Sequence, residues 1–196
     1  GELRVTHEQN LVLADVEQSK LFKLWQEAKA HGLATPNIGL LTDMICCPGG
    51  DFCSLANAKS LPIAAAIAER FDSIDFQHDI GEIELNISGC INACGHHHVG
   101  SIGILGVDKD GSEWYQVSIG GAQGNNAAIG KIIGPSFSSL QMPEVIGRLL
   151  HVYVRDRHEG ERFVDTAQRL GLAPFKEHVY ATPITVGNLV GEDEYV

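Results

Sequence analysis

Apolar and polar residues alternate most regularly over residues 82–88, where every second position carries isoleucine or leucine. Neighbouring side chains of a strand point to opposite sides, so this pattern predicts a half-buried strand. Its outward face is predicted to carry Glu82, Glu84, Asn86 and Ser88. Two more strands are predicted over residues 101–107 and 113–119, because the DKDG between them is typical of a hairpin turn.

Helical spacing of apolar residues predicts helices over residues 21–28, 63–71, 145–153 and 161–170. Residues 3–16 are rich in valine and leucine around a polar centre, which predicts an extended segment. Residues 37–46 are apolar but too few to separate helix from strand. The remainder of the chain, to residue 196, is predicted to be irregular and ends in an acidic tail at Glu192–Glu194. We predict an α+β fold with a mixed sheet and flanking helices.

Composition and charge narrow the class of protein. The 196 residues are 44% hydrophobic and 20% charged, which is typical of a folded domain rather than a disordered chain. Acidic residues outnumber basic ones by 25 to 14, giving a formal charge of −11, which argues against binding to nucleic acid or to an anionic membrane surface. No apolar run approaches the ~20 residues of a membrane-spanning helix.

Cysteine usage points to metal chemistry. Four of the five cysteines form two pairs in glycine-containing loops, with five residues between Cys47 and Cys53 and three between Cys90 and Cys94. Structural zinc sites usually have fewer residues between paired cysteine ligands, whereas the larger core of an iron–sulfur cluster accommodates wider spacing. The spacing therefore favours an iron–sulfur cluster, leaving a structural zinc site with four cysteine ligands and buried structural cysteines as alternatives. The odd cysteine number, without a signal peptide, predicts a reducing cytoplasmic location.

The sequences CCPGGDFCSLANAKSLPIA and ISGCINACGHHHVGSIGILGV resemble the two cluster motifs of the nitrite/sulfite reductase family, whose members use sirohaem and a 4Fe–4S cluster. WYQVSIGGAQG resembles the strand and double-glycine loop that follow the cluster motif in that family, and residues 3–16 resemble a strand of its ferredoxin-like half-domain. The resemblance spans about residues 3 to 175. The paired cysteine motif is its most specific part.

The resemblance implies that Cys47, Cys53, Cys90 and Cys94 hold the cluster. It implies that Cys94 also supplies the thiolate that bridges to the sirohaem iron, and that Asn92 and Gly95 lie against the macrocycle or the cluster. The implied activity is six-electron reduction of sulfite to sulfide or of nitrite to ammonia. Electrons would come from ferredoxin or an NADPH-dependent flavoprotein. A cluster-bearing electron-transfer module without haem and a cofactor-free interaction domain are further alternatives.

In this family the basic residues that bind the anion lie upstream of the cluster motifs. Near the motifs of this chain the basic residues are Lys59 and, further along, Lys109 and Lys131. We therefore expect a C-terminal part of a longer reductase that lacks turnover without its N-terminal half. The expected organisation is a ferredoxin-like remnant over residues 1–36, a cluster and sirohaem domain over 37–175 and a tail over 176–196.

Two further features lie next to the paired cysteines. Cys46 has no place in the motif, and we interpret it as a buried neighbour. His96, His97 and His98 follow Cys94 directly, and either pack beside the cluster loop or donate protons to the reduced substrate. In an extended segment neighbouring side chains diverge, so the three histidines are not expected to meet at one metal.

Overall fold

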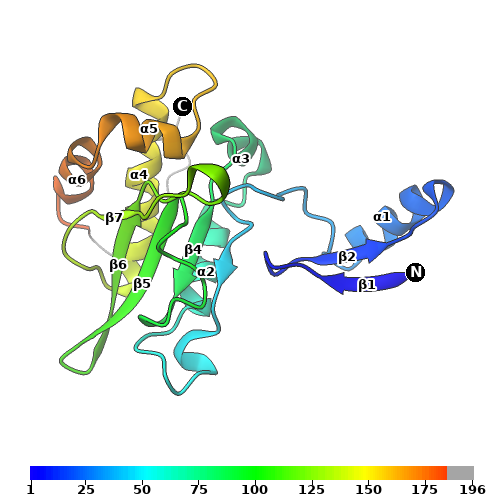
Figure 1. Ribbon diagram of the computed structural model, residues 1–196, viewed down its shortest axis with the longest axis horizontal. Coiled ribbons are helices and arrows are strands. Elements are labelled where there is room, and N and C mark those ends of the chain that lie inside the picture. Colours follow the sequence, from blue (N-terminus) through cyan, green and yellow to red (C-terminus); the bar gives the residue numbers. More distant parts are fainter. Residues whose placement is uncertain (185–196) are drawn as a thin grey trace. The chain divides into compact units, whose positions relative to one another are not determined.

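A mixed sheet of five strands, in the order β3-β4-β5-β6-β7, organises the larger part of the computed structural model (Figure 1). The strands β3, β4 and β5 are parallel, whereas β5, β6 and β7 are antiparallel. Their bounds are β3 Ile45–Cys46, β4 Leu85–Ser88, β5 Ile102–Lys109, β6 Ser112–Ile119 and β7 Lys131–Ile132. The predicted α+β class with a mixed sheet is confirmed.

The structure describes residues 1–184 and divides the chain into the units Gly1–Ile38 and Gly39–Val196. The acidic segment Glu192–Glu194 lies outside the described residues. Among those that are described, no helix has both the length and the apolar character needed to cross a membrane.

One face of the sheet carries the hydrophobic core. Ile87, Ile104 and Val117 are fully buried and belong to one cluster with apolar residues of α2 (Leu61–Arg70) and α4 (Met142–Asp156). Both helices start with a proline in the first turn, where its missing N–H has no intrahelical partner to lose. Figure 1 shows these helices behind the sheet.

Three shorter helices complete the larger unit: α3 (Ile74–Ile80), α5 (Phe163–Leu170) and α6 (Ala173–Tyr180). Single 3₁₀ turns occur at Gln18–Lys20, Gly49–Asp51, Gly124–Asn126 and Ser139–Gln141. The prediction that the chain is irregular after residue 170 is wrong for α6. That helix has only eight residues, and its buried side chains Phe175 and Val179 give too short a pattern to recognise.

The polar face of β4 differs from the prediction. Asn86 and Ser88 were expected to face outward, yet each is only 1% exposed. They lie opposite the core face, where a chain segment over residues 95–100 covers them, as described below. The alternation of apolar and polar residues correctly separates the two faces of β4. The segment over residues 95–100, however, buries the polar face.

The N-terminal unit contains an antiparallel hairpin of β1 (Glu2–Val5) and β2 (Leu11–Ala14), followed by α1 (Leu21–Ala30). The extended segment predicted for residues 3–16 is therefore two strands, because its polar centre forms the turn. The Thr6 N–H donates to the Asn10 carbonyl at 2.9 Å across that turn. Helix α1 has no buried residue along its length, and most apolar side chains of the hairpin are exposed.

Acid is expected to loosen the packing of α6 on α4. The His178 ring lies 4.7 Å from the His151 ring, centroid to centroid. Burial first, and then the positive charges of His151, Arg155 and Arg148, lower the pKa of His178 in the folded chain. Its unfolded pKa is about 6.5. A group with a depressed folded pKa binds its proton more tightly when unfolded, so stability falls as the pH drops below the unfolded value.

Unfolding in urea at pH 7.5 and pH 5.0 tests this expectation. His178→Gln should lose less stability between the two pH values than the wild type. An equal loss in both proteins would contradict it. His7→Gln, at a well-exposed site in the N-terminal unit, is the matched control and should behave like the wild type.

Candidate functional site

The two cysteine pairs start at the carboxyl ends of adjacent parallel strands. Cys47 directly follows β3, and Cys90 lies two residues after β4. The Cys47 N–H continues the ladder by donating to the Ile87 carbonyl at 3.0 Å. Carboxyl ends of parallel strands share one edge of a sheet, where the chain leaves the ladder and its loops are available for binding. The topology therefore brings both motifs to one edge.

The two loops also contact each other directly. The backbone N–H groups of Asn57 and Ala58 donate to the Gly89 carbonyl at 2.9 and 3.1 Å. A methyl group on Gly89 would lie 2.6 Å from the Ala58 carbonyl oxygen and 2.9 Å from the Gly49 Cα. Position 89 therefore has room for glycine only, and its missing side chain allows the two loops to pack against each other.

The four cysteines of the motifs differ in exposure. Cys47 and Cys90 are buried, Cys53 is partly buried and Cys94 is exposed, and all are free thiols. Within residues 1–184, no group of three or more His, Cys, Asp or Glu side chains is placed to hold a metal ion.

The donor set fits an iron–sulfur cluster, because the ligands of such a cluster are thiolates. The Gly89 N–H already donates to the Cys47 sulfur at 3.0 Å. Such N–H···S contacts are typical of thiolates that carry negative charge in a cluster site. The two joined loops thus supply four thiols and at least one donor aimed at a sulfur.

Residues 95–100 cross the polar face of the sheet. The Gly95 N–H donates to the Ser88 hydroxyl at 3.1 Å, and the Asn86 amide donates to the His96 carbonyl at 3.1 Å. Further along, the Gly130 N–H donates to the His98 carbonyl at 2.8 Å. These bonds fix the chain that leaves Cys94.

The two β4 side chains that anchor this segment were missed as site residues. The available signal was their position: Asn86 and Ser88 are polar residues of a strand that ends beside Cys90. Asn92, by contrast, is exposed within the motif, and Gly95 lies against the β4 backbone. Their contact with a cofactor stays a prediction.

Cys46 occupies a different environment from the motif cysteines. Its thiol donates to the Cys47 carbonyl at 3.3 Å and packs against the core. Burial, and then the neighbouring Cys47, raise the pKa of Cys46 to about 12. The thiol therefore stays protonated at neutral pH, which suits a packed neighbour rather than a metal ligand.

The histidine run forms a turn rather than the extended segment assumed from the sequence. His96 has a φ of 54°, in the left-handed region. His97 is partly buried, and its Nδ1 has no hydrogen-bond partner within residues 1–184. Burial, followed by the charge of His98, lowers the pKa of His97. A neutral imidazole is thus favoured next to the loop.

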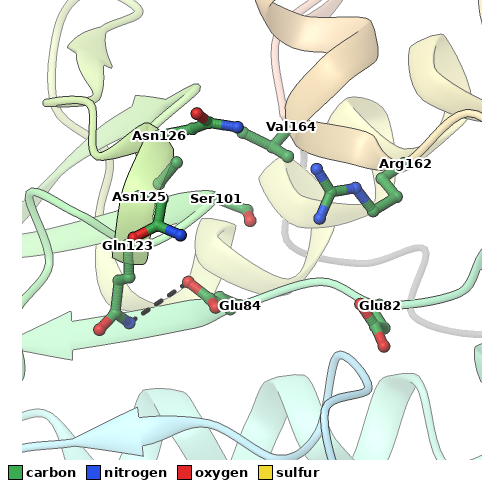
Figure 2. Close-up of a pocket in the computed structure, with 9 residues that line it drawn as sticks. Glu82, Glu84, Ser101, Gln123, Asn125, Asn126, Arg162 and Val164 are labelled. Carbon is green, nitrogen blue, oxygen red and sulfur yellow. Dashed lines mark hydrogen bonds between the residues drawn. The ribbon is translucent and has the colours of Figure 1, made fainter.

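A polar pocket lies at the other end of β4, away from the cysteine loops (Figure 2). Gln123 donates to the Glu84 carboxylate at 3.3 Å, and Arg162 pairs with Asp165 at 2.8 Å. Two carboxylates and one already paired guanidinium do not favour an inorganic anion. The pocket is lined by Glu82, Glu84, Ser101, Ala122, Gln123, Asn125, Asn126, Arg162 and Val164.

Two of the three lysines named from the sequence have partners. Lys59 pairs with Asp51 at 3.5 Å, and the Lys109 ammonium lies 5.3 Å from the centroid of the Trp114 ring. Lys131 is exposed on β7. The described residues thus show no cluster of these lysines that would hold a doubly charged anion.

Together, the fold and its loops define an α+β domain that brings two cysteine-containing loops to one sheet edge, where Cys47 and Cys90 follow adjacent parallel strands. A family described as the nitrite and sulphite reductase 4Fe-4S domain matches residues 40–184. The chain therefore belongs to the nitrite and sulphite reductase 4Fe-4S domain family.

Individual relatives agree with this assignment. "Sulfite reductase [ferredoxin] 2" of Mycolicibacterium paratuberculosis is 30% identical over 177 residues, covering 85% of this chain and 32% of the relative. The "Sulfite reductase [NADPH] hemoprotein beta-component" of Bacillus licheniformis is 27% identical over 176 residues, covering 88% of this chain and 30% of the relative. The solved structure of Mycobacterium tuberculosis NirA protein matches with a TM-score of 0.74 at 27% identity. The match covers 88% of this chain and 33% of the NirA chain. The chain thus spans about a third of the length of these relatives.

Proposed function

We propose that Cys47, Cys53, Cys90 and Cys94 bind a 4Fe–4S cluster that serves a sirohaem-dependent sulfite reductase. The observation that carries the proposal is the joining of two cysteine loops at one sheet edge through the Gly89 carbonyl and N–H. Family membership supports the type of cluster, and the names of the relatives support sulfite as the substrate. Nitrite is the second candidate substrate, because the family name includes it.

The complete reaction is six-electron reduction of sulfite to sulfide, or of nitrite to ammonia. When bound, the cluster would supply single electrons and the sirohaem iron would supply the binding position for the anion. Cys94 is the cysteine proposed to link the two groups, and its exposure supports this role. Asn92 is exposed in the same loop and is proposed to contact the macrocycle.

The chain's own residues hold, shield and orient the site. Ser88 and Asn86 fix the segment after Cys94 through the bonds described above. Phe52, Leu55 and Ile91 project from the two cysteine loops and are 80%, 70% and 83% exposed. We infer that the rest of the reductase covers these apolar side chains and so excludes water from the cofactors.

The remaining parts of the reaction are assigned outside this chain. Basic residues that bind the anion are proposed to come from the N-terminal half of a longer protein, in keeping with the share of the relatives that is covered. The electron donor is proposed to be a ferredoxin or an NADPH-dependent flavoprotein, as the names of the relatives suggest. A reducing, cytoplasmic location is proposed as well, because five cysteines are an odd number and too few for a disulfide framework in a chain of this length. The N-terminal unit, up to Ile38, is proposed to be the remnant of a ferredoxin-like half-domain.

Metal analysis of the anaerobically purified chain tests this proposal. We expect about four irons and about four acid-labile sulfides per chain, with little zinc, and no sulfite turnover by the chain alone. Zinc without iron would contradict it. An absorption spectrum taken after the N-terminal half is supplied separates the alternatives. Sirohaem bands support the reductase, whereas cluster absorption alone supports an electron-transfer module.

A further inference from the structure

Ser60 follows the Cys47 and Cys53 pair in the chain and contacts the first of these cysteines. Its hydroxyl oxygen lies 3.5 Å from the Cys47 sulfur, and both residues are buried, with Ser60 fully so. The Gly89 N–H donates to the same sulfur at 3.0 Å. Cys47 therefore has two polar hydrogens within reach of its sulfur, one from each of two chain segments.

The hydroxyl of Ser60 is available because it does not cap the helix that it precedes. Ser60 is the N-cap residue of α2, a position where serine usually accepts a hydrogen bond from a backbone N–H of the first turn. In the described part of the chain its side chain accepts no such bond. Pro62 stands in the first turn and has no N–H to offer. The hydroxyl instead faces Cys47.

Close packing holds Ser60 in this position. A methyl group on Gly49 would lie 2.4 Å from the Ser60 nitrogen and 2.7 Å from its hydroxyl oxygen. The absence of a side chain at Gly49 thus brings the first cysteine loop onto the start of α2. The serine cannot turn toward water, since its side chain is enclosed.

Ionisation fixes the direction of the bond. A thiol and a hydroxyl can each donate, but a metal-bound thiolate has no proton and can only accept. We propose that Ser60 is a positioning residue that donates a hydrogen bond to the Cys47 thiolate and raises the reduction potential of the cluster. This inference rests on the proposed cluster function.

The sign of the effect follows from charge. Reduction adds one electron to the cluster, so the negative charge on its sulfur ligands increases. A donor hydrogen stabilises the more negative state more strongly, which raises the potential, and hydrogen bonds to the sulfurs are a known determinant of cluster potentials. Removing the Ser60 hydroxyl should lower the reduction potential of the cluster. The Gly89 N–H still donates to the Cys47 sulfur, so part of the stabilisation of the reduced state remains.

Redox titration of the cluster-loaded protein, followed by electron paramagnetic resonance, measures this effect. Ser60→Ala should shift the ratio of reduced to oxidised cluster at a fixed potential by about tenfold toward the oxidised form. For a one-electron couple this shift is about 59 mV. The matched control is Ser54→Ala, which removes an exposed hydroxyl beside Cys53 and should leave the potential unchanged.

Each outcome has a defined meaning. A lower potential in Ser60→Ala alone supports the proposal. An unchanged or higher potential overturns it, as does an equal fall in the Ser54→Ala control. If the wild type loads iron and sulfide but Ser60→Ala loads none, the hydroxyl is needed for assembly and the proposed tuning role is wrong. A wild type that loads no cluster overturns the proposed function itself, which the iron and sulfide analysis detects separately.

Discussion

Replacing Cys90 with serine is expected to abolish binding of the iron–sulfur cluster. Cys90 is buried at the carboxyl end of β4, where the Gly89 carbonyl joins its loop to the first cysteine loop. A serine hydroxyl is far less acidic than a thiol and is a harder ligand, so it replaces a thiolate poorly at an iron–sulfur core. We expect iron and labile sulfide in the purified Cys90→Ser protein to fall at least about tenfold below the wild type.

Cys46→Ser is the matched control for this loss. It removes a thiol next to Cys47 that stays protonated and bonds to a backbone carbonyl. We expect it to retain the iron and sulfide content of the wild type. Retention of a full cluster in Cys90→Ser, or loss of it in Cys46→Ser, would show that the ligand assignment is wrong. Circular dichroism of both variants checks that they fold.

Replacing Gly95 with alanine is expected to cause the largest loss of stability among the glycine positions of the site. The added methyl group would lie 2.0 Å from the Ile87 carbonyl oxygen and 3.2 Å from the Ser88 hydroxyl. The first contact involves backbone of the interior strand β4, which cannot move without breaking its hydrogen bonds to β3 and β5. We expect the free energy of unfolding to fall by about 3 kcal/mol, the upper range for overpacking.

The loop would also be displaced, because its Gly95 N–H bond to Ser88 would be broken. The cluster content should therefore fall together with the stability. Gly50→Ala is the control, since its methyl group would meet its neighbours at 3.4 Å or more, an ordinary contact distance. Its unfolding free energy should change by less than about 0.5 kcal/mol. Urea unfolding of both variants gives the comparison, and equal stabilities would refute the steric argument.

Prediction from the sequence was most successful where a pattern was long or chemically specific. The strands β5 and β6 with their hairpin turn, and the helix α4 with its long apolar stripe, were predicted at nearly their observed positions. Two of the short helices were not. Helix α3 was missed and α6 was predicted to be irregular, because helices of seven and eight residues depend on packing against α4 and its neighbours for their stability.

The residues of the candidate site also differ in how far the sequence indicates them. The four cysteines could be proposed as ligands from their spacing and glycine context, because that combination reflects local loop geometry and ligand chemistry. Asn86 and Ser88 had only their position in the strand before Cys90 as a signal, because their contacts with the second cysteine loop form on folding. Ser60 had no such signal, because its contact with Cys47 also forms only on folding. The Ser60 to Cys47 contact spans 13 positions in the chain, and nothing in the local sequence specifies it.

The sequence by itself determined the fold class, the faces of the main strands and the set of thiols. These properties depend on residue type and on spacing within a few turns of the chain. Tertiary structure alone decided that two parallel strands bring the cysteine loops to one edge, and that a returning loop buries the polar face of β4. It also decided which glycines allow close approach. These features arise from contacts between distant segments, whose pairing is set by the packing of the whole sheet and its helices.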